Sequence, residues 1–87
     1  MKNYTAIYLK HFGLDVSDFV PCENCGKRAQ DIHHINGRGK GKDVIDNLMA
    51  VCRDCHKAAH GEAKTYLHPD VMQTIHDEYI LNFNTNN

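Results

Sequence analysis

The stretch of sequence that decides the fold is residues 52–60, Cys52-Arg53-Asp54-Cys55-His56-Lys57-Ala58-Ala59-His60. Cys52 and Cys55 have the two-residue spacing of a metal-binding knuckle. His56 and His60 are four positions apart, which places two imidazoles on one face of a helix, because residues i and i+4 lie one above the other. Neither pattern completes a metal site alone, so the rest of the chain must supply partners.

The first partner is a second CxxC pair, which repeats the knuckle spacing. Two such pairs make a Cys₄ tetrahedron of the kind that holds structural zinc. Such a site is closed, because protein supplies all the ligands, and its binding free energy is folding free energy. Zinc would therefore compensate for the marginal core of a chain of 87 residues. We predict a structural zinc site formed by Cys22, Cys25, Cys52 and Cys55.

The second partner is the pair His33-His34. His56 is adjacent to Cys55, about 100° away around a helix, so the two side chains cannot easily point at one ion. Three histidines with an open position make a catalytic type of metal site. A further histidine, free of the metal, has a pKa that suits general base catalysis. The residues alone do not decide which member of the pair is the ligand, because adjacent side chains in a strand point to opposite faces.

Composition and charge limit the class of protein. The length predicts one domain over residues 1–87. The N-terminus lacks the apolar segment of a signal peptide and no apolar run is long enough to span a membrane, so we expect the cysteines to bind metal in a reducing cytoplasm. The net charge of −1 is unusual for a nucleic-acid-binding domain. Any basic surface must therefore be local.

Hydrophobic periodicity predicts an α+β arrangement around these motifs. Two short strands form a hairpin inside the motif core, residues 22–60, and helical segments flank that core on both sides. The apolar stripes of the flanking helices offer faces for a protein partner or a second copy of the chain. The predicted elements are a helix over 4–12 with Gly13 as its C-cap, a linker over 14–21, strands over 29–35 and 48–51, a helix over 53–61, a flanking segment over 62–83 with a helix beginning at Pro69, and a frayed tail over 84–87.

The loop between the strands is rich in glycine and basic residues. Arg38, Lys40 and Lys42 place three positive charges on a flexible backbone. This pattern suits contacts with DNA phosphates, which position nucleic acid without reading its sequence. Arg38 is the best candidate for contact with a phosphate in the transition state of a reaction, because its guanidinium can hold phosphate bidentately. The alternative is a solvated turn without a ligand.

Together these motifs resemble the HNH endonuclease family, whose active site is a ββα-metal finger. The family is named for a His, an Asn and a His, which here would be His34, Asn47 and His56. The resemblance covers residues 22 to 60 and leaves both end helices outside it. The matching elements are Cys22-x₂-Cys25-Gly26, Asp31-Ile32-His33-His34-Ile35, Asn47-Leu48-Met49-Ala50-Val51-Cys52 and Cys52-x₂-Cys55-His56-x₃-His60.

The resemblance implies a role for each of these residues. His34 would be the general base that deprotonates the attacking water. Asn47 would accept a hydrogen bond from His34 through its side-chain carbonyl. Asp31, two residues before His33, shares its face of the strand and could orient a ligand histidine, although a surface aspartate is the alternative. The ligands of the catalytic divalent ion (Mg²⁺, Mn²⁺, Ni²⁺ or Zn²⁺) would be His33, His56 and His60.

The activity implied by the resemblance is metal-dependent hydrolysis of DNA, by nicking or double-strand cleavage, that leaves 5′-phosphate and 3′-hydroxyl ends. The rival interpretation is a non-catalytic zinc module that binds nucleic acid or protein through the same fold. A third is a nuclease that works only in a larger assembly, docked through its end helices. Small stand-alone HNH proteins that resemble this chain are often encoded by phages and mobile elements.

Overall fold

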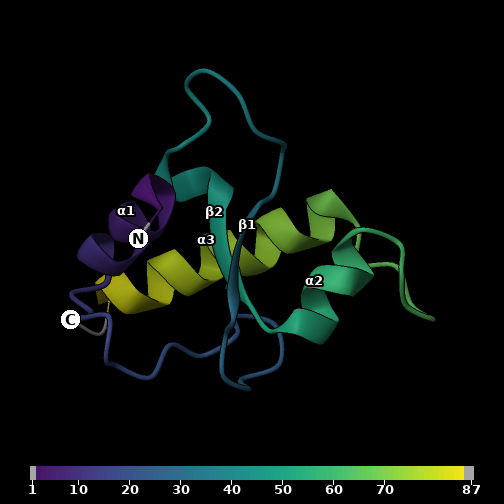
Figure 1. The fold of residues 1–87 in the computed structure, drawn as a ribbon, viewed down its shortest axis with the longest axis horizontal. Helices are drawn as coiled ribbons and strands as arrows, with labels where there is room; N and C mark the ends of the chain where they lie inside the picture. The colour runs from purple at the N-terminus through teal and green to yellow at the C-terminus, as the bar shows by residue number, and fades with distance from the viewer. Residues whose placement is uncertain (1, 86–87) are drawn as a thin grey trace.

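The computed structural model describes residues 2–85 and centres on a short β-hairpin with helices on both sides (Figure 1). The predicted α+β class is confirmed, and β1, β2 and α2 follow one another in the order of a ββα-metal finger. No helix within residues 2–85 has the length and apolar character needed to cross a membrane. In chain order the elements are α1 (Asn3–His11), β1 (Asp31–His34), the 3₁₀ helix η1 (Ile45–Asn47), β2 (Leu48–Val51), α2 (Arg53–Ala59) and α3 (Pro69–Thr85).

The register of the hairpin separates the two histidines of β1. The strands are antiparallel, with Asp31 opposite Val51 and His33 opposite Met49. Directly opposed residues lie on the same face of a sheet, and successive residues alternate between faces. Asp31 and His33 therefore share one face of the hairpin, while His34, opposite Leu48, lies on the other.

Each face of the hairpin covers its own apolar core, which is why every residue of β2 is buried. The knuckle core lies on the face of Met49 and Val51. The terminal-helix core lies on the face of Leu48 and Ala50. The knuckle core consists of Cys22, Ile35, Met49, Val51, Cys52, Cys55 and Met72. The terminal-helix core consists of Tyr8, Phe12, Leu48 and Ala50, with Tyr4, Ile7, Tyr79, Ile80 and Phe83 packed against it.

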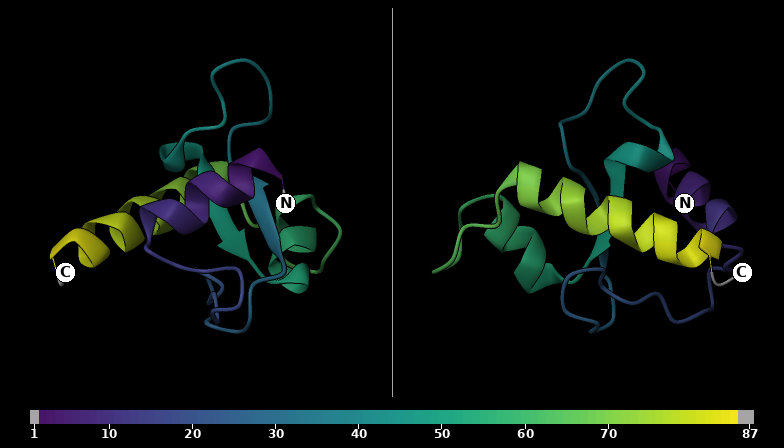
Figure 2. Two further views of the ribbon diagram at one scale, coloured as in Figure 1. Left: turned by 60° about the vertical axis from the view of Figure 1, so that its left-hand side comes forward. Right: turned by 180° about the vertical axis from the view of Figure 1, so that it is seen from behind.

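Helix α3 runs along the back of the hairpin, and the views of Figure 2 show it passing from the α2 side to the α1 side. Its Met72 belongs to the knuckle core, and its Phe83 packs on Phe12 of α1 with ring centroids 4.9 Å apart. The apolar stripes of the end helices thus pack largely against other parts of this chain. Val71 and Leu81 of α3 remain exposed.

Helix α1 ends as its sequence predicts. Gly13 has a φ of +65°, a conformation that costs glycine little because it has no Cβ. Its N–H donates to Lys10 O, and the N–H of Leu14 donates to Leu9 O at 2.8 Å, which are the two hydrogen bonds of a Schellman motif. Gly61, with a φ of +74°, follows the last turn of α2 in the same way.

Several element boundaries differ from the sequence-based expectation by one or two residues, and two of these differences have a clear physical cause. Strand β1 begins at Asp31 rather than at Ala29, because the N–H of Ala29 donates outside the hairpin, to Val20 O at 2.8 Å. Helix α3 continues through Asn84 and Thr85, which the frayed tail was expected to include. The packing of Phe83 against Phe12 secures the last turns of α3. Residues 86 and 87 of the predicted tail lie outside the described part of the chain.

A buried polar network joins the first CxxC knuckle to both end helices. The side chains of Glu23 and His76 are fully buried, and Glu23 Oε1 accepts a hydrogen bond from His76 Nδ1 at 2.7 Å. The other ring nitrogen of His76 lies 2.6 Å from the carbonyl oxygen of Ile45, which can only accept. Tyr8 donates to Glu23 Oε2 at 2.6 Å. Nε2 of His76 therefore carries a proton, and the raised pKa of His76 favours a second proton on Nδ1, which makes the pair an imidazolium beside a carboxylate.

Replacing His76 with alanine is expected to destabilise the fold by about 3–5 kcal/mol, because it leaves the Glu23 carboxylate buried without a counter-charge. Burial alone would lower the pKa of His76, but Glu23 and the Ile45 carbonyl outweigh it and raise that pKa. The ion pair thus stabilises the fold fully below the ordinary histidine pKa of about 6.5, and this contribution declines as pH rises through the raised folded-state pKa. Urea unfolding of the zinc-loaded chain measures both effects. A loss under 1 kcal/mol would contradict the assignment of a charged pair.

Candidate metal centres and active site

The four cysteines meet at the base of the hairpin. Cys22 and Cys25 lie in the turn before β1, while Cys52 and Cys55 lie at the start of α2. One sulfur from each residue falls in a group whose members are all within 4.8 Å of one another. Cys25 Sγ and Cys52 Sγ are 3.6 Å apart, close to the roughly 3.8 Å edge of a tetrahedron with Zn–S bonds of about 2.3 Å. The donor set and its spacing fit a zinc ion.

Backbone N–H groups stabilise negative charge on the cysteine sulfurs of this cluster. Burial alone would raise the pKa of the Cys22 thiol, but the backbone N–H groups of Cys52, Cys25 and Asn24 outweigh it and lower the pKa. The thiolate is the form that binds metal. Cys52 is also the N-cap of α2, where its sulfur accepts a hydrogen bond from the N–H of Cys55 at 3.5 Å. A metal at this site would therefore fix the first turn of α2.

Three of the histidines converge further along α2. His33 projects from β1, His56 from α2, and His60 is the C-cap residue that follows α2. Their ligand nitrogens all lie within 4.8 Å of one another. His56 Nε2 and His60 Nε2 are 3.2 Å apart, within the roughly 3.0–3.4 Å expected of two imidazoles on one ion with bonds of about 2.0–2.1 Å. The three histidines therefore fit a divalent ion.

Asp31 sets the tautomer of His56. Its Oδ2 accepts hydrogen bonds from His56 Nδ1 and from Arg53 Nε, each at 2.9 Å, so the lone pair of His56 is on Nε2, which faces His60. Burial alone would raise the pKa of Asp31, but the hydrogen bonds from Arg53 and His56 outweigh it and lower the pKa. Burial, together with neighbouring His56 and His60, lowers the pKa of His33 to about 4. His33 is thus neutral at pH 7, as a metal ligand must be.

Changing Asp31 to asparagine is expected to weaken binding of the second metal ion by about 10–100-fold, because partners of ligand histidines fix ring orientation and raise basicity. The structural zinc should remain, since Asp31 is not a member of the cysteine group. Calorimetric titration of Mn²⁺ into the zinc-loaded chain measures the effect. The matched control is Asp15→Asn, which changes an exposed aspartate outside the site. Equal affinity in the two variants would exclude the orienting role.

His34 lies on the opposite face of β1 and meets a different set of groups. It is buried, and its Nε2 hydrogen-bonds Asp43 Oδ1 at 2.8 Å. Its Nδ1 is also buried but has no hydrogen-bond partner among the described residues 2–85. The ring of Tyr4 in α1 packs edge-on against it, with centroids 4.6 Å apart. Because a carboxylate can only accept, Asp43 holds the proton on Nε2 and leaves the lone pair on Nδ1. Sequence reasoning missed Asp43, which lies nine positions beyond His34 in an irregular loop.

The expected hydrogen bond between His34 and Asn47 is wrong. Asn47 Oδ1 accepts from the N–H of Asn36 at 2.7 Å, and its Nδ2 donates to the carbonyl oxygens of Gly37 and Lys42 at 3.1 and 3.0 Å. Every polar atom of the side chain is thus occupied by the backbone of the loop between the strands. Asn47 fixes the path of that loop, which in turn carries Asp43 to His34.

The two sets of histidines line one cleft of about 300 Å³. The cleft forms where β1 ends, so residues from both faces of the strand reach it. Arg38 also lines this cleft, whereas Lys40 and Lys42 are exposed and do not. The loop between β1 and η1 projects from the rest of the fold (Figure 1). The histidine cleft is lined by Ile32, His33, His34, Gly37, Arg38, His56 and His60.

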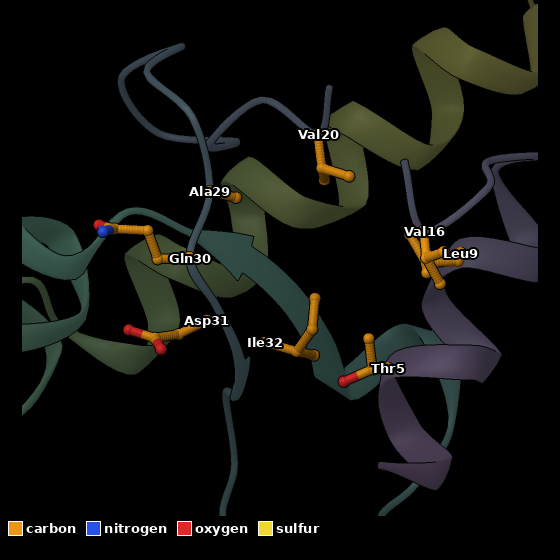
Figure 3. A pocket seen from close by; sticks show the side chains of 8 residues that line it. All are labelled: Thr5, Leu9, Val16, Val20, Ala29, Gln30, Asp31 and Ile32. Atoms are coloured by element: carbon orange, nitrogen blue, oxygen red, sulfur yellow. The ribbon is translucent and has the colours of Figure 1, made fainter. Parts of the chain in front are cut away.

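A second hollow, of about 210 Å³, lies beside the cleft but has a different character. Figure 3 shows its lining side chains, which come from α1, from the segment of Val16 and Val20, and from β1 with the residues before it. Most are apolar, and none is a histidine or cysteine. This hollow therefore contributes no ligand to either metal site.

Comparison with known proteins finds similarity over the segment that contains both groups of residues. Residues 22–62 match the family model described as HNH endonuclease. The type IV methyl-directed restriction enzyme EcoKMcrA of Escherichia coli strain K12 is 36% identical over 50 residues, which cover 45% of this chain and 18% of that protein. This chain thus spans less than a fifth of that relative's length, and no solved structure gives a significant match. The segment from residue 22 to residue 62, which carries both groups of candidate metal-binding side chains, is therefore similar to the HNH endonuclease family.

Proposed function

We propose that this chain hydrolyses DNA phosphodiester bonds, with one divalent ion held by His33, His56 and His60 and with His34 as the general base. One observation carries the proposal. A histidine with an unpartnered, buried Nδ1 lines the same cleft as three histidines that converge within ligand distance of one another. A buried polar atom without a partner is costly, and an attacking water beside the scissile phosphate would supply that partner.

The reaction begins with a proton transfer to His34. Nδ1 takes a proton from the water while the water oxygen attacks phosphorus, and the bond from phosphorus to O3′ breaks. The departing O3′ takes a proton from solvent, so the products are 5′-phosphate and 3′-hydroxyl ends. Asp43, bonded to Nε2 at 2.8 Å, would stabilise the imidazolium formed in this step. A divalent ion, when bound, supplies Lewis-acid stabilisation of the charge at the phosphoryl and leaving oxygens.

Arg38 would hold the DNA backbone in place for this step. Its guanidinium can contact a phosphate bidentately, and it lines the cleft beside His34. Lys40 and Lys42, exposed on the loop, would contact phosphates further along the DNA. These contacts position the backbone without reading bases, so they do not select a sequence.

Plasmid cleavage tests the proposal. The zinc-loaded chain is incubated with supercoiled DNA and with Mg²⁺, Mn²⁺, Ni²⁺ or additional Zn²⁺, beside a His60→Ala variant. We expect nicked or linear DNA from the wild type with at least one ion, and none above background from the variant. End-labelling of the products should reveal 5′-phosphates. Cleavage that is equal in wild type and variant under every ion would overturn the proposal.

The rival, a non-catalytic zinc module, predicts a different metal content. It requires one tightly bound zinc ion per chain and no second binding event. The nuclease requires one tight zinc ion and a weaker, exchangeable ion at the histidines. Metal analysis before and after dialysis separates the two, since only the nuclease shows a second event that His60→Ala removes.

A further inference from the structure

The first helix, which lies outside the segment matched by the HNH family model, packs against two residues that line the cleft. Tyr4 of α1 packs edge-on against His34, with ring centroids 4.6 Å apart. Its ring also faces Arg38, whose Cζ is 5.2 Å from the ring centroid, and Arg38 Nη2 donates to the Tyr4 hydroxyl at 3.3 Å. A cation over an aromatic face and a hydrogen bond to the same residue together fix the guanidinium.

A second cation lies on the same tyrosine. Lys2 Nζ is 5.8 Å from the Tyr4 ring centroid. Lys2, Tyr4, Thr5 and Arg38 line a further hollow of about 290 Å³. This hollow shares Ile32, Arg38 and His56 with the cleft of the histidines, so the two adjoin. A ligand in the first could continue into the second.

The charge of this hollow favours an anion. Its lining includes the cations Lys2 and Arg38 and the carboxylate of Asp31. That carboxylate is already occupied, because Arg53 holds both of its oxygens at 2.9 and 3.3 Å and His56 also donates to it. The lysine and the guanidinium therefore keep their positive charge for a ligand, and the hydroxyl of Tyr4 adds a hydrogen-bond donor.

We propose that Lys2, Tyr4 and Arg38 form a subsite for a DNA backbone phosphate that neighbours the phosphate to be cleaved. The proposal rests on the function proposed above and extends the substrate-binding surface to α1. Tyr4 acts as a positioning residue that holds Arg38 and borders His34, while Lys2 and Arg38 supply the charge. The chain has a net charge of −1, so a local pair of cations has to provide attraction that overall charge does not.

DNA binding measured against salt concentration tests this subsite. Fluorescence anisotropy of a labelled DNA duplex is followed with the zinc-loaded chain and no other divalent ion. We compare Lys2→Ala with Lys10→Ala, which removes an exposed lysine on the same helix but outside the subsite. The slope of log K against log salt is negative, and each lost phosphate contact reduces its magnitude by about 0.9. We expect that decrease for Lys2→Ala and Arg38→Ala, and no decrease for Lys10→Ala.

Variants of Tyr4 test the positioning role. Tyr4→Ala should weaken DNA binding as Arg38→Ala does, and combining the two changes should add little further loss. Tyr4→Phe keeps the ring but loses the hydroxyl, so its affinity should lie between those of wild type and Tyr4→Ala. Circular dichroism checks that these variants fold. Lys2→Ala should disturb the fold least, because Lys2 is exposed.

Two results would overturn the subsite. One is a salt dependence of Lys2→Ala that equals that of Lys10→Ala, since this indicates diffuse attraction. The other is full additivity of Tyr4→Ala and Arg38→Ala, since independent residues do not form one site. Failure of the proposed function looks different, because DNA would then bind with the expected salt dependence and remain uncleaved with every ion.

Discussion

Replacement of His34 by alanine is expected to slow DNA cleavage by about 10²–10⁴-fold, the contribution of a positioned general base. The second metal ion should bind with unchanged affinity, because His34 contributes no atom to the group of three histidines. Single-turnover cleavage at saturating metal measures the first quantity and calorimetric titration the second. The matched control is His68→Ala, which removes an exposed histidine outside the cleft and should leave both unchanged.

Asp43→Asn tests whether the Asp43 carboxylate sets the tautomer that lets His34 act as a base. An amide can donate its N–H to Nε2 of His34, and the ring would then carry its proton on Nδ1, where it cannot take one from water. We expect a slower cleavage rate with unchanged metal affinity and unchanged fold. If Asp43→Asn cleaves at the wild-type rate, the carboxylate does not set the tautomer. If His34→Ala loses metal affinity in proportion to rate, His34 is a ligand and the base lies elsewhere.

The second large effect concerns the cysteine site, where Cys52→Ser is expected to unfold the chain. Structural zinc contributes about 10–16 kcal/mol of apparent binding free energy in small zinc-dependent domains, whereas a whole domain is stable by only about 5–15 kcal/mol. Cys52 is buried and also caps α2, so its loss affects both the ion and the helix. Far-ultraviolet circular dichroism and zinc analysis of the purified variant measure the outcome.

His60→Ala is the matched comparison for Cys52→Ser, because His60 is an exposed C-cap residue rather than part of a core. Its helix content and zinc content should equal those of the wild type while cleavage is lost. Equal loss of helix in the two variants would contradict the division into one structural and one catalytic ion. A chelator that removes the structural zinc should abolish both helix content and binding of the second ion, since α2 carries ligands of each.

Local sequence patterns were sufficient to predict the two groups of ligands. The two residues of each CxxC pair are close together in the sequence, and so are His56 and His60. Helix geometry fixes which of such neighbouring side chains share a face. The hairpin and α2 were predicted for the same reason, because Leu48–Val51 forms a compact apolar run and glycine follows the helix. The family resemblance, rather than spacing, distinguished His33 from His34.

The tertiary structure alone decided which groups support these ligands. Asp43 reaches His34, and Asn47 bonds loop backbone instead of His34, because the loop between the strands takes a path that no periodicity describes. The buried pair of Glu23 and His76 spans 53 positions of the sequence.

The contact of Tyr4 with His34 likewise joins α1 to the cleft across thirty positions. Contacts of this kind form only when distant elements pack against the two faces of the hairpin. The sequence by itself therefore predicted which cysteines and histidines gather as candidate metal ligands. The packing of the end helices and the loop determined how the histidines are oriented and what surrounds them.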